Sequence, residues 1–92
     1  MENERKNEDT RIAVIGIIIE NLESAAAVNE ILHHYNSFII GRMGLPYREK
    51  QVNIISIVVD APADIISAAS GKLGRLPGVS AKALYSKQQS RT

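Results

Sequence analysis

RIAVIGIII, residues Arg11–Ile19, is the stretch that decides the fold of this 92-residue chain. Isoleucine and valine fill most of it, and β-branched side chains favour the extended backbone of a strand. The apolar run ends at a polar cluster that begins with Glu20. The stretch therefore predicts a strand near the centre of a sheet.

A helix is predicted directly after this strand. From Leu22 onward the apolar residues recur with the period of a helix, which places Val28, Ile31 and Leu32 on one side of it. Asn21 is a plausible N-cap because its side chain can accept a hydrogen bond from a free amide of the first turn. The pair Asn36-Ser37 closes the helix.

The remaining elements follow from the same patterns. QVNIISIVVD (51–60) is a second apolar strand suited to the sheet centre, and Pro77-Gly78 forces a break before the last strand. Asp60 or Ala61 is expected to cap the second helix, with Pro62 in its first turn. The other expected elements are a strand at 37–43, a turn-bearing connection at 44–50, a helix from about 62 to 76 and a strand at 79–86.

This order, βαββαβ, predicts an α+β fold of the ferredoxin-like type. Right-handed crossovers would place both helices on one face of a four-stranded antiparallel sheet. We assign residues 11–86 to a single domain. The polar stretches at 1–10 and 87–92 are expected to be a disordered leader and a flexible tail.

The two long strands are apolar on both faces. Ile12, Val14 and Ile18 alternate with a second set that contains Ile15 and Ile17. A sheet face in water should instead be polar. Two helices cover one face, so a second copy of the chain is expected to cover the other, in a dimer or tetramer. Either set can face the helices. We assign one of them, Ile15, Ile17, Ile55 and Ile57, to the oligomer interface.

Composition excludes several classes of function. The net charge is +1, so no strongly basic surface is available for DNA, and there are no cysteines for disulfides, thiolate metal sites or iron–sulfur clusters. No apolar run approaches the roughly 20 residues that span a bilayer. The serines form no recognisable motif with a histidine and an aspartate. We therefore expect a cytoplasmic protein that is not an enzyme, has no cofactor and binds neither DNA nor membrane.

His33 and His34 are the two histidines of the chain and the weak candidates for metal binding. Neighbours on a helix diverge by about 100°, whereas helical chelation uses residues four apart. Both also lie in the last turn of the predicted helix, where histidine is favourable against the helix dipole. The prediction is that no metal site is present.

The stretch around Gly41-Arg42-Met43-Gly44 is the candidate for ligand binding. It is not a nucleotide fingerprint, because it follows a strand into a hairpin and does not open a helix. Its arginine and Arg48 can meet an anion, or they can protect a sheet edge from aggregation. Asn21, at the start of the first helix, completes the candidate ligand residues.

Two stretches carry a family resemblance. LGRLPGV (73–79), together with the order of elements, resembles ACT-like regulatory domains. The segment Ile39–Pro62 resembles the core of stand-alone iron-only hydrogenase system regulators, and the resemblance extends over most of Arg11–Ser86. It implies an ACT-like fold, similar also to the sensing domain of nickel-responsive repressors. ACT domains typically bind small ligands, often amino acids, at subunit interfaces.

The chain departs from both patterns. ACT ligand sites commonly use a glycine between the first strand and helix, whereas this turn reads Glu20-Asn21-Leu22-Glu23. The nickel repressors use a cysteine and strand-borne histidines, which are missing here. The main hypothesis is an oligomeric, non-catalytic regulatory module linked to iron-only hydrogenase maturation, with an unidentified small ligand. The alternatives are a protein-binding adaptor without a ligand and a metal sensor that uses the helical histidines.

Overall fold

The structure is a computed structural model that describes residues 10–87. The leader and tail that we predict to be disordered lie outside these residues, apart from Thr10 and Lys87. Thr10 is the first residue of the first strand.

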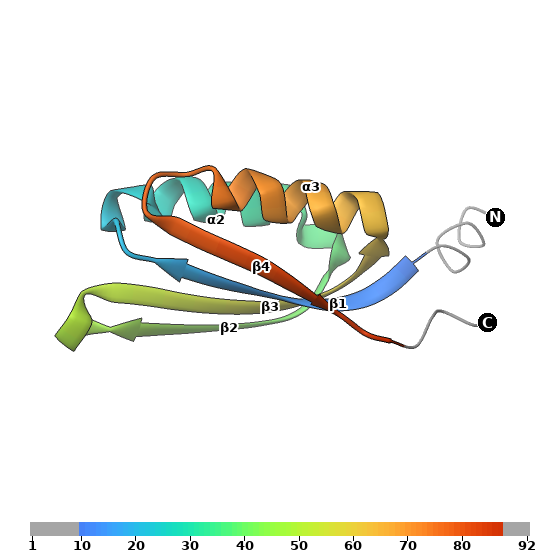
Figure 1. Ribbon diagram of the computed structural model, residues 1–92, viewed down its shortest axis with the longest axis horizontal. Coiled ribbons are helices and arrows are strands. Elements are labelled where there is room, and N and C mark those ends of the chain that lie inside the picture. Colours follow the sequence, from blue (N-terminus) through green and yellow to red (C-terminus); the bar gives the residue numbers. More distant parts are fainter. Residues whose placement is uncertain (1–9, 88–92) are drawn as a thin grey trace.

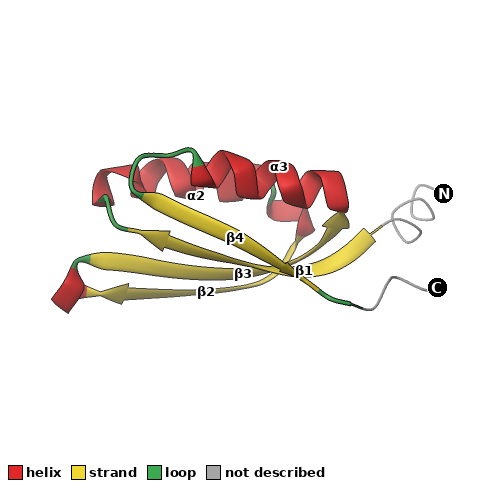
Figure 2. Cartoon of the chain, in the orientation of Figure 1, coloured by secondary structure: helices red, strands yellow, loops and turns green. Residues whose placement is uncertain are grey.

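The elements follow the predicted order, with two helices packed on one side of the sheet (Figures 1 and 2). The strands are β1 (Thr10–Ile19), β2 (Ile39–Tyr47), β3 (Val52–Pro62) and β4 (Val79–Tyr85), and the helices are α2 (Ala25–His34) and α3 (Ala63–Gly74). Short 3-10 turns occupy Leu22–Ser24, Asn36–Phe38 and Arg48–Lys50. The predicted ferredoxin-like, ACT-like fold is confirmed.

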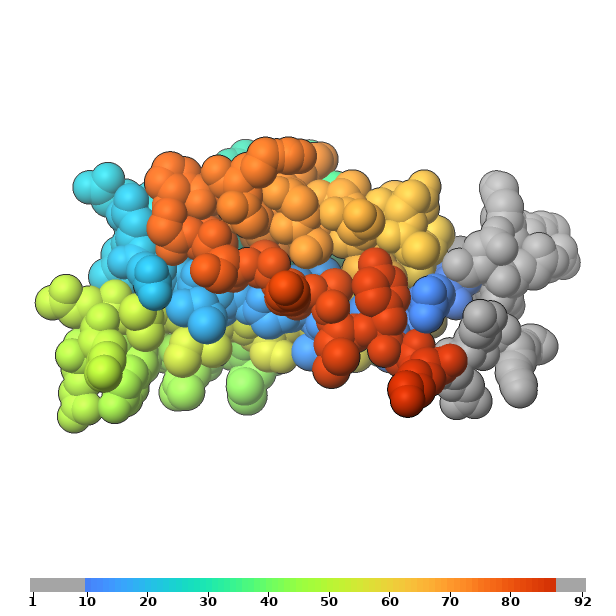
Figure 3. Space-filling model, viewed as in Figure 1, coloured from blue at the N-terminus to red at the C-terminus, as the bar shows by residue number. Residues whose placement is uncertain are grey.

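The sheet has the strand order β2-β3-β1-β4, and each neighbouring pair is antiparallel. The two apolar strands, β1 and β3, therefore lie at the centre, as their composition predicts. Ile15 lies opposite Ile57 in this central pair. The end of the β2–β3 hairpin extends past the helix layer (yellow-green at the lower left of Figure 3).

Two predicted boundaries are wrong. β2 continues through Pro46 to Tyr47, where we predict a turn. This proline is compatible with a strand because β2 is an edge strand, where a missing N–H can face away from the sheet. Asp60 and Ala61 pair with β1 as part of β3, so the N-cap position of α3 is taken by Pro62, which makes no side-chain capping hydrogen bond.

The core lies between the helices and one face of the central strands. Ile15 and Ile17 are completely buried, and Ile57 and Ile55 are 1% and 7% exposed. Val28 and Leu32 of α2 and Ile66 and Leu73 of α3 belong to the same core cluster. Our assignment of Ile15, Ile17, Ile55 and Ile57 to an oligomer interface is therefore corrected, because the helices already cover them. The alternation of side chains along β1 and β3 separates the residues into two faces, but it does not indicate which face the helices cover.

The first helix begins at a junction with the turn before β4. Asn21 caps the 3-10 turn Leu22–Ser24 that leads into α2, because its side-chain Oδ1 accepts a hydrogen bond of 3.0 Å from the amide of Glu23. Ser24 is 6% exposed, and its hydroxyl donates a 2.7 Å hydrogen bond to the carbonyl of Pro77. The amide of Glu20 donates to the carbonyl of Gly78 at 2.7 Å. These contacts join the starts of the first helix and the last strand.

Replacing Ser24 with alanine should test this junction. The carbonyl of Pro77 would lose its hydroxyl partner in a partly buried place, which typically costs about 1–2 kcal/mol. We expect the free energy of unfolding, measured by urea denaturation, to fall by that amount. Ser67→Ala, on the exposed side of α3, is the control and should change stability little. Equal stability of the two variants would mean that the bond to Pro77 contributes nothing.

Candidate functional site

The sheet face opposite the helices is apolar and uncovered within one chain. β1 presents Ile12, Val14 and Ile18 on this face, and these side chains are 36–43% exposed. The strand register brings apolar residues of the other three strands beside them. The apolar members from those strands are Met43, Leu45, Tyr47, Val52, Ile54, Val58 and Leu84. We call these residues, together with the three of β1, the open face.

The open face is large for a monomer. Its seven most exposed members are between 36% and 72% exposed. Side chains of this size expose roughly 200 Å² when free, so together they present on the order of 700 Å². The largest apolar patch on a typical monomer is about 300–600 Å², and a standard protein interface buries about 800 Å² on each partner. The open face is therefore of the size that a stable interface requires.

Charged residues lie at the borders of the open face. Lys82 is on the edge strand β4, opposite Gly16, and Asp60 is near the end of β3, opposite Ile12. Between them Gly16 and Ser56 face one another, and a Cβ atom added at Gly16 would meet nothing within 4 Å. The face is thus mainly apolar, with charged residues on an edge strand and near a strand end, and a protein interface commonly combines apolar residues with a polar rim.

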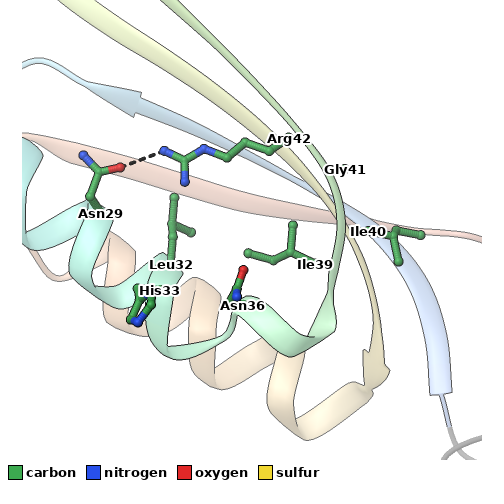
Figure 4. Close-up of a pocket in the computed structure, with 8 residues that line it drawn as sticks. All are labelled: Asn29, Leu32, His33, Asn36, Ile39, Ile40, Gly41 and Arg42. Carbon is green, nitrogen blue, oxygen red and sulfur yellow. Dashed lines mark hydrogen bonds between the residues drawn. The ribbon is translucent and has the colours of Figure 1, made fainter.

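A separate pocket opens on the helix side, between α2 and β2 (Figure 4). It is an open pocket of about 400 Å³. Arg42 reaches across it from β2, and its Nη2 donates a 2.7 Å hydrogen bond to Oδ1 of Asn29. The full lining is Asn29, Leu32, His33, Asn36, Ile39, Ile40, Gly41 and Arg42. We call it the α2–β2 pocket.

A smaller pocket of about 240 Å³ lies at the far end of the hairpin. It brings Leu22, at the start of the first helix, together with Arg48 and Tyr47. The Tyr47 hydroxyl donates a 2.9 Å hydrogen bond to the Glu49 carboxylate. The remaining lining residues are Pro46, Gln51, Val52 and Asn53.

The structure divides the predicted ligand residues among different places. Gly41 and Arg42 line the α2–β2 pocket, whereas Arg48 lines the pocket at the hairpin end. Met43 belongs to the open face, since it pairs with Ser56 and is 59% exposed. Asn21 is engaged as a helix cap. Gly44 is an exposed residue of β2 that lines neither pocket.

The histidines lie in the last turn of α2, as predicted, and both are exposed. His33 lines the α2–β2 pocket and His34 does not. Within residues 10–87, no three histidine, cysteine, aspartate or glutamate side chains come close enough to hold a metal ion together. Over the same range, no helix is long and apolar enough to cross a bilayer.

Two pocket residues, Asn29 and Asn36, are missing from the sequence-based candidates. Asn29 lies inside a helix, where asparagine is less favourable than alanine because its side chain competes for backbone hydrogen bonds. Its Nδ2 donates to the carbonyl of Ala25 at 3.1 Å, and this bond leaves Oδ1 to accept from Arg42. The sequence did contain one indication of this role, because an exposed asparagine inside a predicted helix can form hydrogen bonds to residues outside that helix.

One protein family matches most of the chain. Its description reads "TM1266-like: Iron-only hydrogenase system regulator, putative", and the match spans residues 11–83. The chain belongs to this TM1266-like family. The resemblance predicted from Ile39–Pro62 is therefore confirmed at the level of the family.

A solved member of the TM1266-like family has the same fold. The uncharacterized protein TM1266 from Thermotoga maritima superposes with a TM-score of 0.82 at 35% sequence identity, covering 86% of this chain and all of that one. A formyltetrahydrofolate deformylase from Pseudomonas putida KT2440 superposes with a TM-score of 0.61 at 8% identity. That match covers 85% of this chain and 30% of the deformylase, and it shows the fold alone. No curated protein matches the chain.

Proposed function

We propose that this TM1266-like protein is a non-catalytic, homo-oligomeric regulatory module of the iron-only hydrogenase system. The observation that carries the proposal is the open face. On the order of 700 Å² of apolar surface would forfeit well over 10 kcal/mol of burial if it stayed wet, at roughly 25 cal/mol per Å². That is comparable with the whole stability of a domain of this size. A second copy is the occupant because the area matches one standard interface.

The link to hydrogenase rests on membership of the family. A regulatory role without catalysis fits a small domain in which both of the pockets described above are open. The absence of cysteine suits a reducing cytoplasm, where we place the protein. The signal that such a module senses would be a small ligand.

Light scattering coupled to size exclusion tests self-association directly. One chain has a mass of 10.1 kDa, so a dimer or tetramer should elute with twice or four times that mass at micromolar concentration. The mass should not fall at high salt, because burial of apolar surface is not screened. A mass of one chain would contradict the proposal.

Thermal-shift screening separates a sensor from a protein-binding adaptor. A ligand that binds only the folded state raises the unfolding temperature, and the rise grows with the logarithm of the ligand concentration relative to its Kd. We expect a shift with at least one class of small molecule among amino acids, other carboxylates, nucleotides and divalent metals. No shift with any class would favour the adaptor, in which the surfaces described above serve protein contacts alone.

A further inference from the structure

We propose that the α2–β2 pocket binds a small organic carboxylate, with Arg42 holding the carboxylate and Ile39 contacting a short apolar tail. The role of such a ligand as a signal rests on the proposed function. The pocket itself is built within one chain and does not depend on self-association.

A local irregularity of β2 directs Arg42 into the pocket. The register shifts between Ile39 and Gly41, so Ile40 is left without a partner and Arg42 lies opposite Ile57. Ile57 faces the helices, and Arg42 therefore faces them as well. An uninterrupted ladder from Ile39 would place Gly41 at this position instead. Bulges commonly re-aim a side chain in this way, and they are frequent next to functional sites.

The guanidinium of Arg42 is held in place before any ligand arrives. Asn29 accepts from its Nη2 at 2.7 Å, and Asn29 is itself fixed by donating to the carbonyl of Ala25 at 3.1 Å. The bond to Asn29 uses one of the five N–H donors of an arginine. Arg42 is exposed, so its remaining donors are accessible. An oriented guanidinium matches the two oxygens of a carboxylate and loses little side-chain entropy on binding.

The lining favours an anion with an apolar part. Arg42 is the charged residue of the lining, His33 is the titratable one, and no acidic residue is among the eight. Figure 4 shows Ile39 and Asn36 on the same side of β2 as Leu32, whereas Ile40 lies on the other side of the strand. A carboxylate at Arg42 would thus have apolar surface next to it and an amide, Asn36, nearby. Small-molecule sites commonly combine a few polar groups with apolar walls in this way.

The test is an NMR titration with three probes: isocaproate, its uncharged analogue isocaproamide, and inorganic phosphate. We follow amide proton–nitrogen correlations of the full chain. Isocaproate should produce saturable shifts at Gly41, Arg42 and other pocket residues, and it should bind at least about tenfold more tightly than the amide. Phosphate should bind more weakly than isocaproate, because it makes no apolar contact.

Variants assign the binding to Arg42. Arg42→Gln should weaken isocaproate binding about tenfold or more, and Asn29→Ala should weaken it by a smaller factor because the guanidinium loses its orientation. Arg48→Gln is the matched control, since it removes the same charge from the same hairpin outside this pocket. Both arginines are exposed, so the variants should remain folded by circular dichroism.

Four results would overturn the proposal: no saturable shift in the pocket, equal affinity for isocaproate and its amide, equal or tighter binding of phosphate, or unchanged binding in Arg42→Gln. In the last case the Arg42–Asn29 bond only ties the edge strand to the helix. Light scattering on the same samples separates this failure from failure of the proposed function. Loss of self-association would leave the pocket intact, and loss of carboxylate binding would leave the oligomer intact.

Discussion

Replacing Ile18 with glutamate is expected to convert the proposed homo-oligomer into a 10.1 kDa monomer. Ile18 lies in a central strand of the open face, between Ile54 of β3 and Ser80 of β4, and it is 43% exposed in one chain. A carboxylate there would be buried in the interface without a partner. Such a charge typically costs several kcal/mol, which weakens association by more than a hundredfold.

The fold of one chain should tolerate this change, because Ile18 points away from the helices and the core. Circular dichroism should therefore show an unchanged spectrum while light scattering shows the lower mass. Ala68→Glu is the matched control, since it introduces the same charge at an exposed position of α3. An Ile18→Glu protein that is folded and keeps the wild-type mass would place the interface elsewhere.

Replacing Gly78 with alanine is expected to reduce the free energy of unfolding by about 3 kcal/mol or more. Gly78 has a φ of +69°, in the region that residues with a Cβ atom rarely adopt. An added Cβ would lie 2.5 Å from the Cβ of Asn21 and 2.8 Å from its backbone nitrogen. Backbone cannot move aside as a flexible side chain can, so the junction between the first helix and β4 would have to open.

Gly74→Ala is the control for this prediction. Gly74 is the last residue of α3, and an added Cβ would meet nothing within 4 Å. Alanine should leave stability unchanged or raise it by up to about 1 kcal/mol, because glycine is a poor helix former. Urea denaturation of both variants gives the comparison. Equal stabilities would show that the contact between Gly78 and Asn21 relaxes at no cost.

A comparison of the Gly78→Ala and Ile18→Glu variants also distinguishes the stability of one chain from that of the assembly. Gly78→Ala acts on the folding of each chain, and Ile18→Glu acts on the contact between chains. For an oligomer, apparent stability rises with protein concentration by mass action. The unfolding temperature of wild type should therefore depend on concentration, whereas that of Ile18→Glu should not.

Much of the fold is predictable from the sequence because the signals are local. The β-branched run of Arg11–Ile19 favours a strand wherever it is placed, and the helical period from Leu22 onward needs only neighbouring turns to appear. Asn21 caps the 3-10 turn before α2 through an amide two residues away. Even the need to cover a second sheet face follows from local alternation, since both residue sets of β1 and β3 are apolar.

The candidate site depends on contacts that local patterns do not encode. Arg42 and Asn29 are thirteen residues apart, and they meet because a bulge at Ile40 turns the arginine toward α2. A bulge changes the face of every following residue in a strand, so the alternation seen in the sequence loses its meaning beyond it. This is why Arg42 lies opposite Ile57 on the helix side, and why Met43 lies opposite Ser56 on the open face.

The sequence by itself determined the order of the elements, the central position of the two apolar strands and the presence of two apolar sheet faces. Only the tertiary structure decided that the helices cover Ile15 and Ile57 and leave Ile18 and Ile54 open. The physical reason is that both sets satisfy the same period and hydrophobicity. The choice between them is made by the packing of the helices against the sheet, which brings together residues far apart in the chain.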